Sequence, residues 1–198
     1  MQDASNTSMP LRGSALARGA LRLFGWRVVG PATLPARAVV IAYPHTSNWD
    51  FLVGILGRDA LGLSAHWVGK DSLFRWPLGI AMRALGGIAV NRRQRSGFVE
   101  RIASEFAQRE GFLLAIAPEG TRSRTPGWKS GFYRIALAAK VPVVLGCIDY
   151  TRHEVGIVGC VELSGIEADD LARIAAAYAG KDGRYPDRQS PVVLLSGR

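Results

Sequence analysis

A histidine and an aspartate lie five positions apart in this chain, within residues 44–50. Histidine is the side chain best suited to accept a proton near neutral pH, and a nearby carboxylate can hold its ring in one tautomer. The preceding residues 38–42 are apolar and rich in β-branched side chains, which is typical of a covered strand. The pair therefore stands where a strand ends and a loop begins, a common place for chemistry. This pattern predicts a general base, His45, oriented by Asp50 and placed to deprotonate a hydroxyl group.

Two further turns carry charged residues directly after predicted strands. Residues 86–92 begin with two glycines and end on Arg92, and residues 117–124 contain one acid and two arginines. Ligands of open α/β sheets bind beyond the carboxyl ends of the strands, so we expect both turns to gather near His45. Each turn alone is typical of an ordinary solvated turn or helix start, but the ordered combination is more specific.

The elements that must position these residues alternate between strand and helix. This alternation predicts an α/β sandwich, with a central, mostly parallel mixed sheet flanked by helices in a single domain. Strands are expected over residues 26–29, 38–42, 66–69, 88–90, 112–117, 141–148 and 155–161, and helices over 14–24, 50–62, 73–85, 97–109, 128–140 and 169–179.

A chain of 198 residues with 48% apolar composition is expected to form one domain with a substantial core. We expect a flexible N-terminus over residues 1–13, the folded domain over 14–180 and an irregular C-terminal tail over 181–198. The helix over 14–24 is amphipathic and carries arginines on its polar face. Such a helix suits an anionic bilayer surface or a solvated face of the domain, and both interpretations stay open.

The composition narrows the function classes. The net charge of +9 indicates an anionic partner, which is a nucleic acid, a membrane surface or a phosphorylated small molecule. The sequence contains no uncharged apolar run of about 18 residues, so no membrane-spanning helix is expected. Cys147 and Cys160 show neither a disulfide framework nor metal-ligand spacing, and His66 and His153 lack metal-ligand neighbours, so no metal site is expected. The chain also lacks the Gly-x-Ser-x-Gly elbow of an α/β-hydrolase.

Taken together, the three turns resemble the motifs of the glycerolipid acyltransferase family. The His-x4-Asp motif of that family is matched by His45 and Asp50. Its second motif, a glycine-led strand that ends in arginine, resembles residues 86–92. Its third motif, Pro-Glu-Gly-Thr-Arg-Ser, is matched without change by residues 118–123. The resemblance covers roughly residues 38–150.

The resemblance implies an O-acyltransferase of phospholipid biosynthesis. Such an enzyme moves a fatty acyl group from an acyl thioester to the hydroxyl of a lysophospholipid such as 1-acylglycerol 3-phosphate. His45 and Asp50 would be catalytic, and the arginines would hold the acceptor's phosphate through charge-assisted hydrogen bonds. The substrate-binding residues that the resemblance implies are Arg92, Glu119, Gly120, Thr121 and Arg122.

The same resemblance implies the partners and the location. The acyl donor would be acyl-CoA or acyl-carrier protein, a co-substrate rather than a cofactor. The protein would be cytoplasmic and peripheral on the inner face of the cytoplasmic membrane, with an anionic membrane surface as partner. Glu119 has two interpretations: it hydrogen-bonds an acceptor hydroxyl, or it fixes an arginine.

The sequence leaves several alternatives open. Ala117 and Leu145 depart from the family pattern, which leaves room for another acceptor such as a lyso-ornithine lipid. A catalytically altered lipid-binding relative is disfavoured by the intact His45 and Asp50. A basic nucleic-acid-binding domain rests on net charge alone, without a recognition motif, and no nucleic acid partner is expected.

Overall fold

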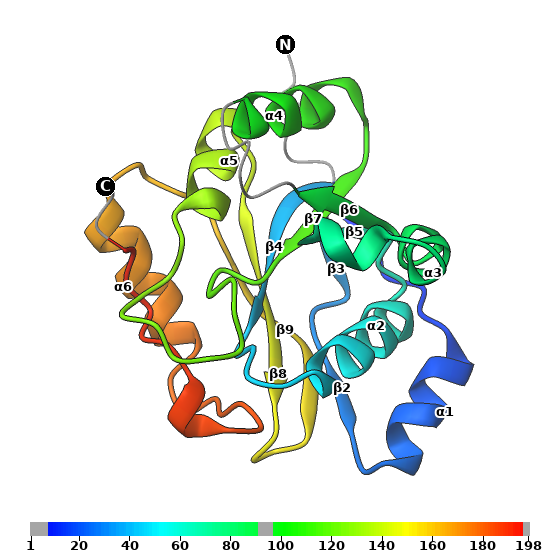
Figure 1. Ribbon diagram of the computed structural model, residues 1–198. Coiled ribbons are helices and arrows are strands. Elements are labelled where there is room, and N and C mark those ends of the chain that lie inside the picture. Colours follow the sequence, from blue (N-terminus) through cyan, green and yellow to red (C-terminus); the bar gives the residue numbers. More distant parts are fainter. Residues whose placement is uncertain (1–7, 91–96, 196–198) are drawn as a thin grey trace.

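The computed structural model describes residues 8–90 and 97–195, so Arg92 lies outside the described residues (Figure 1). The strands are β1 (Ser8–Pro10), β2 (Arg27–Val29), β3 (Thr33–Pro35), β4 (Arg37–Tyr43), β5 (Ala65–Lys70), β6 (Gly87–Val90), β7 (Phe112–Ile116), β8 (Val143–Asp149) and β9 (Glu154–Val161). The helices are α1 (Ala15–Leu23), α2 (Trp49–Leu61), α3 (Leu78–Ala84), α4 (Phe98–Gln108), α5 (Gly131–Ala139) and α6 (Glu167–Ala177), with the short 3-10 helices η2 (Asp71–Phe74) and η3 (Pro186–Arg188).

Seven strands form one central sheet in the order β2-β9-β8-β4-β7-β5-β6. The strand β4 lies in its middle and pairs in parallel with β7 on one side and with β8 on the other. Within the sheet the described pairs are parallel except β8 with β9, which is antiparallel. The separate pair β1–β3 is antiparallel. The predicted fold class, a mostly parallel mixed sheet flanked by helices, is confirmed.

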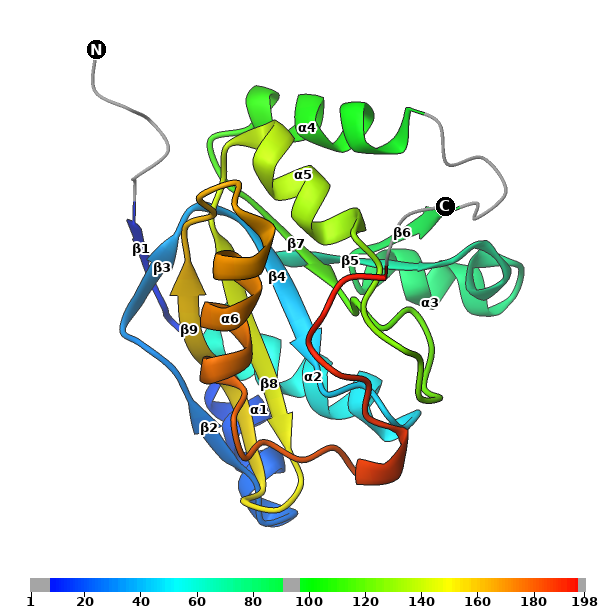
Figure 2. The ribbon, with the colours of Figure 1, turned by 90° about the vertical axis from the view of Figure 1, so that its left-hand side faces the viewer.

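Helices cover both faces of the sheet. Figures 1 and 2 place α1, α2 and α3 along one side and α4, α5 and α6 along the other. Successive residues of a strand point to opposite faces, so Val39 and Ile41 join the core beneath the second group while Val40 joins the core on the other face. Burial on both faces explains why β4 is a nearly continuous apolar run. The site residues that follow β4 therefore start from a central strand that is buried on both faces.

One predicted helix is broken. The sequence predicts a helix over 73–85, whereas the structure has η2 and then α3, with Pro77 between them. A proline disfavours the helical conformation in the residue before it, here Trp76, so the helix restarts only after the proline. The other predicted elements, apart from the helix over 128–140, agree with the structure to within two residues at each end.

The predicted helix over 128–140 begins late, at Gly131. Trp128 forms a bridge with Leu194, and its N–H donates to the carbonyl of Val193 at 2.7 Å. This pairing with a distant segment holds Trp128 in an extended conformation, so the helix cannot include it. The local sequence pattern is overridden by tertiary contact.

The described ends of the chain pack on the domain. β1 falls within the stretch 1–13 and pairs with β3, and Tyr185 N in the 181–198 stretch donates to Thr46 Oγ1 at 3.1 Å. Within the described part of the chain, no helix combines the length and apolarity that crossing a bilayer requires.

Candidate active site

The loop between β4 and α2 carries the histidine and the aspartate. β4 ends at Tyr43, and Asp50 lies in the first turn of α2 with its side chain directed back toward the loop. The backbone N–H groups of Thr46 and Ser47 both donate to Asp50 Oδ2 at 2.8 Å. A helix N-terminus stabilises negative charge, so this position suits a buried carboxylate. Asp50 is 2% exposed and is held firmly by its own loop.

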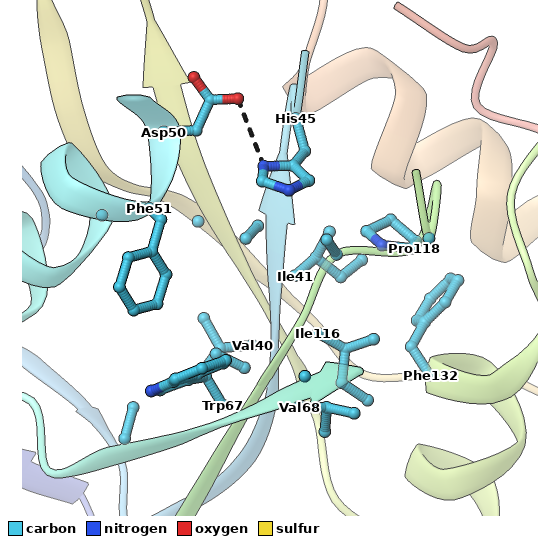
Figure 3. A pocket seen from close by; sticks show the side chains of 18 of the residues that line it. Val40, Ile41, His45, Asp50, Phe51, Trp67, Val68, Ile116, Pro118 and Phe132 are labelled. Atoms are coloured by element: carbon cyan, nitrogen blue, oxygen red, sulfur yellow. Dashed lines mark ion pairs between the residues drawn. The ribbon is translucent and has the colours of Figure 1, made fainter. Parts of the chain in front are cut away.

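His45 faces this carboxylate. Its Nδ1 lies 3.3 Å from Asp50 Oδ2, and the imidazole is 19% exposed (Figure 3). With the proton on Nδ1 directed at the carboxylate, Nε2 keeps a free lone pair. Figure 3 shows the opposite edge of the ring turned toward the space between Phe51 and Pro118. The arrangement can accept a proton from a hydroxyl that enters this space.

Glu119 holds the backbone of His45 in place. Its Oε2 accepts a hydrogen bond from the backbone N–H of His45 at 2.7 Å, and its Oε1 accepts one from the N–H of Ser190 at 2.9 Å. The side chain is 1% exposed. Burial raises the pKa of Glu119, and the two backbone donors oppose that rise. This geometry gives the carboxylate a third role, unlike either interpretation from the sequence: it joins the His45 loop to the C-terminal segment.

Gly120 and Lys129 fit closely together. Gly120 has a φ of +64°, and a Cβ built there would lie 2.6 Å from Lys129 Nζ. Glycine therefore satisfies both the left-handed backbone and the passage of the lysine side chain. Thr121 and the exposed Arg122 follow in the same loop and line the same cavity as His45.

The structure thus brings most of the predicted site together. One cavity is lined by His45, Asp50, Gly120, Thr121 and Arg122. The sixth predicted residue, Glu119, is not among the lining residues, and it accepts a hydrogen bond from the backbone N–H of His45. Arg92 falls outside the described residues, and its predicted role stays a prediction. Across residues 8–90 and 97–195, no group of three or more metal-ligating side chains is placed to hold a metal ion.

The cavity has a volume of about 1010 Å³ and opens where the sheet divides. β5 pairs with β7 only as far as Trp67 opposite Ala115. Beyond that point β5 continues with β6, while β7 continues with β4 up to Ile116. The two strand pairs separate at their carboxyl ends, and this separation leaves a slot beneath His45. Ligand cavities span roughly 300–1,000 Å³, so the slot is large enough for a long ligand.

The walls of this slot are mainly apolar. Figure 3 shows Val40, Phe51 and Trp67 on one side of β4, and Ile41 with Phe132 on the other. Val40 and Ile41 are consecutive strand residues, so the cavity reaches both faces of the sheet around its end. A proton-accepting imidazole at the mouth of an apolar slot suits a reacting group attached to a hydrocarbon chain.

Two residues of the site's surroundings escaped the sequence interpretation. Tyr150 Oη donates to Asp50 Oδ1 at 2.9 Å, and Ser190 accepts from Tyr43 Oη at 2.9 Å through its carbonyl. Tyr150 follows the end of β8, as His45 follows β4, so the same strand-end rule could have found it. Ser190 lies in an irregular segment whose sequence carries no comparable signal.

Comparison with known proteins agrees with this architecture. The family model described as Acyltransferase matches residues 25–148. The 1-acyl-sn-glycerol-3-phosphate acyltransferase of Escherichia coli (strain K12) is 31% identical over 120 residues, which is 57% of this chain and 47% of that protein. The probable 1-acyl-sn-glycerol-3-phosphate acyltransferase of Mycoplasma pneumoniae is 29% identical over 127 residues, 59% of this chain and 46% of that protein. The chain thus spans about half the length of the curated relatives it matches.

A solved structure shares the fold. The crystal structure of the 1-acyl-sn-glycerophosphate acyltransferase PlsC from Thermotoga maritima matches with a TM-score of 0.56 and 22% identity. The match covers 79% of this chain and 70% of that one. The family model spans the strand, loop and helix that carry His45 and Asp50, together with the turn that carries Glu119 and Arg122. Because the family model matches well over half of its length, the chain belongs to the Acyltransferase family.

Proposed function

We propose that this protein transfers a fatty acyl group from an acyl thioester to the hydroxyl of 1-acylglycerol 3-phosphate, in phospholipid biosynthesis. The observation that carries the proposal is the position of His45, which is held by Asp50 at the mouth of the apolar slot. The names of the Escherichia coli and Mycoplasma pneumoniae relatives support this acceptor.

The proposed reaction needs no covalent enzyme intermediate. Nε2 of His45 removes the proton of the acceptor hydroxyl as its oxygen attacks the thioester carbonyl. The carbon–oxygen bond forms and the carbon–sulfur bond breaks. The leaving thiolate takes the proton from His45 and departs as the free thiol. Asp50 stabilises the imidazolium while it carries that proton.

The two chemical ends of the substrates match the two parts of the cavity. The slot beneath His45 is lined by apolar side chains such as Val68 and Phe132, which suit a hydrocarbon chain. The exposed guanidinium of Arg122 lies at the same cavity and suits a phosphate, because arginine forms paired charge-assisted hydrogen bonds. Arg92 is proposed to assist it. The donor is the thioester of CoA or of an acyl-carrier protein.

An acceptor screen tests this proposal. Purified protein is given labelled long-chain acyl-CoA or acyl-carrier protein with lysophosphatidate, with a neutral monoacylglycerol or with a lyso-ornithine lipid. We expect transfer to lysophosphatidate, a roughly 10²–10⁴-fold slower rate in His45→Ala, and a raised KM for lysophosphatidate in Arg122→Gln. Transfer only to the lyso-ornithine lipid would replace the acceptor, and no transfer to any acceptor would overturn the proposal.

We further propose that the helices α1 and α3 rest on an anionic membrane surface. Both lie on the side of the domain that Figure 1 shows at the right, with α2 between them. The same two segments carry exposed arginines, including Arg22 in α1 and Arg75 just before α3. A mixture of exposed apolar and basic side chains favours binding to anionic lipid. The apolar face, as we call it, consists of Leu16 (87% exposed), Leu23 (82%), Phe24 (72%), Trp76 (84%), Leu78 (50%) and Ile80 (67%).

Vesicle sedimentation tests the apolar face. The protein is expected to bind vesicles of phosphatidylglycerol and phosphatidylcholine more tightly than pure phosphatidylcholine, and salt should weaken that binding. Phe24→Glu and Trp76→Glu should each weaken it by about tenfold or more, because each removes a large buried apolar contact with lipid. Ile166→Glu, which changes a 59% exposed side chain at the start of α6, is the matched control. Equal weakening by the control would contradict this surface.

A further inference from the structure

Tyr150 lies in the turn between β8 and β9 and contacts the catalytic carboxylate. Its hydroxyl donates to Asp50 Oδ1 at 2.9 Å, from a position 100 residues further along the chain. The other oxygen of Asp50, Oδ2, accepts from Thr46 N and Ser47 N and faces His45 Nδ1. Hydrogen bonds to Oδ2 fix one corner of the carboxylate, and the bond from Tyr150 fixes the other. Together they define the plane in which the carboxylate meets the imidazole.

The turn that carries Tyr150 is itself held firmly. Asp149 is fully buried, and its Oδ1 accepts from the backbone N–H groups of Thr151 at 3.0 Å and Arg152 at 3.2 Å. Its Oδ2 lies 3.0 Å from Arg152 Nη1. The backbone N–H of Tyr150 donates to the carbonyl of Asp182 at 2.9 Å. The phenol is therefore supplied by a preorganised backbone and not by a freely moving loop.

The surroundings of the phenol keep it a donor. Its ring packs edge-on against Trp26, with ring centroids 5.0 Å apart. Burial raises the pKa of Tyr150, and the charge of Asp50 together with its hydrogen bond raises it further, while the guanidinium of Arg184 opposes the rise. The hydroxyl thus keeps its proton at neutral pH and directs it to the carboxylate.

We propose that Tyr150 is a positioning residue for acyl transfer, which fixes the Asp50 carboxylate and through it the ring of His45. Tyr150 is not among the residues that line the cavity, and it acts on His45 through Asp50. The kinetic part of this inference rests on the proposed function, whereas the geometric part concerns the contact between His45 Nδ1 and Asp50 Oδ2 alone. Tyr150 lies just beyond the residues matched by the family model, 25–148, so its role is read from this chain's own contacts.

The chain offers a matched control for removing this hydroxyl. Tyr133 Oη donates to Asp170 Oδ2 at 2.8 Å, which is also a bond from a tyrosine to a buried carboxylate. That pair joins α5 to α6, away from the catalytic loop. Tyr133→Phe therefore removes the same chemical group from an equivalent bond without touching Asp50.

Two measurements test the proposal. In the acyl-transfer assay Tyr150→Phe is expected to lower kcat roughly tenfold with little change in KM, and Tyr133→Phe should leave kcat unchanged. In proton NMR of protein labelled with ¹⁵N-histidine, wild type should show a downfield Nδ1–H signal that His45→Ala removes. Tyr150→Phe should broaden that signal through faster exchange with water, and Tyr133→Phe should not.

The two measurements separate the possible failures. An inactive wild type whose Nδ1–H signal still depends on Tyr150 would refute the proposed function and support the positioning role. An Nδ1–H signal and a kcat in Tyr150→Phe equal to those of wild type would overturn the positioning role. Equal losses in both tyrosine variants, in proportion to lost folded protein, would also overturn it.

Discussion

Replacing Asp50 by asparagine is expected to lower kcat for acyl transfer by about 10²–10⁴-fold while the fold stays intact. The asparagine side chain can keep the wild-type geometry. Its carbonyl oxygen takes the place of Oδ2 and accepts from Thr46 N and Ser47 N, and its NH₂ group turns toward the oxygen of Tyr150. The hydrogen bonds survive, but the negative charge that stabilises an imidazolium is lost. The rate loss therefore reports the charge of Asp50 and not its packing.

Asp170→Asn is the control for this substitution. Asp170 is also fully buried and also accepts from a tyrosine, with Ser164 and Arg173 as further partners. Burial raises the pKa of Asp170, but the hydrogen bonds from Ser164, Tyr133 and Arg173 outweigh it and lower the pKa to about 2. A carboxyl group with a lowered pKa stabilises the fold above its unfolded pKa, and this contribution is lost as the pH falls toward 2.

Measurements at neutral pH separate the two aspartates. Asp170→Asn should lower the melting temperature and leave kcat per folded molecule unchanged, whereas Asp50→Asn should lower kcat far more than the melting temperature. Both quantities come from one preparation, by thermal unfolding and by acyl transfer to lysophosphatidate. An Asp50→Asn protein with wild-type kcat would remove Asp50 from the proposed mechanism.

The contact between His45 and Asp50 could be predicted from the sequence because its geometry is local. His45 lies two residues after the end of β4 and Asp50 lies in the first turn of α2, so a short loop suffices to bring the two side chains together. Local chemistry and strand-end position were sufficient to bring these two residues together. Gly120 was expected only from the family resemblance, as a substrate-binding residue, and the structure shows its backbone in the left-handed conformation.

The supports of the pair depend on distant segments and could not be predicted in this way. Glu119 Oε1 accepts from the N–H of Ser190, 71 positions away, and Trp128 pairs with Leu194 instead of starting its helix. Hydrophobic periodicity carries no information about such pairings. The two roles expected for Glu119 were a hydrogen bond to an acceptor hydroxyl and the fixing of an arginine. In the structure both of its oxygens accept from backbone N–H groups.

Replacing Glu119 by glutamine is expected to lower kcat at least about tenfold and to lower the free energy of unfolding by about 1–3 kcal/mol. Both carboxylate oxygens accept from backbone N–H groups, one of His45 and one of Ser190. An amide has only one oxygen, so its NH₂ group must face an N–H donor in either orientation. Burial raises the pKa of Glu119, which shows that its charge is unfavourable there. Removing that charge offsets part of the loss in the free energy of unfolding.

Glu154→Gln is the matched control, because Glu154 also holds two donors. Its Oε1 lies 2.9 Å from Arg27 Nη2 and its Oε2 lies 3.2 Å from Lys181 Nζ. The Arg27 side chain is 70% exposed and can turn to water, and Lys181 keeps Asp149 as a second partner at 3.5 Å. The backbone N–H groups at Glu119, in contrast, cannot move without the loop. Unfolding in urea and acyl-transfer kinetics should therefore separate the variants, with kcat lowered only in Glu119→Gln. If Glu119→Gln kept wild-type kcat, His45 would hold its place without the bridge to Ser190, and the C-terminal segment would have no part in positioning the base.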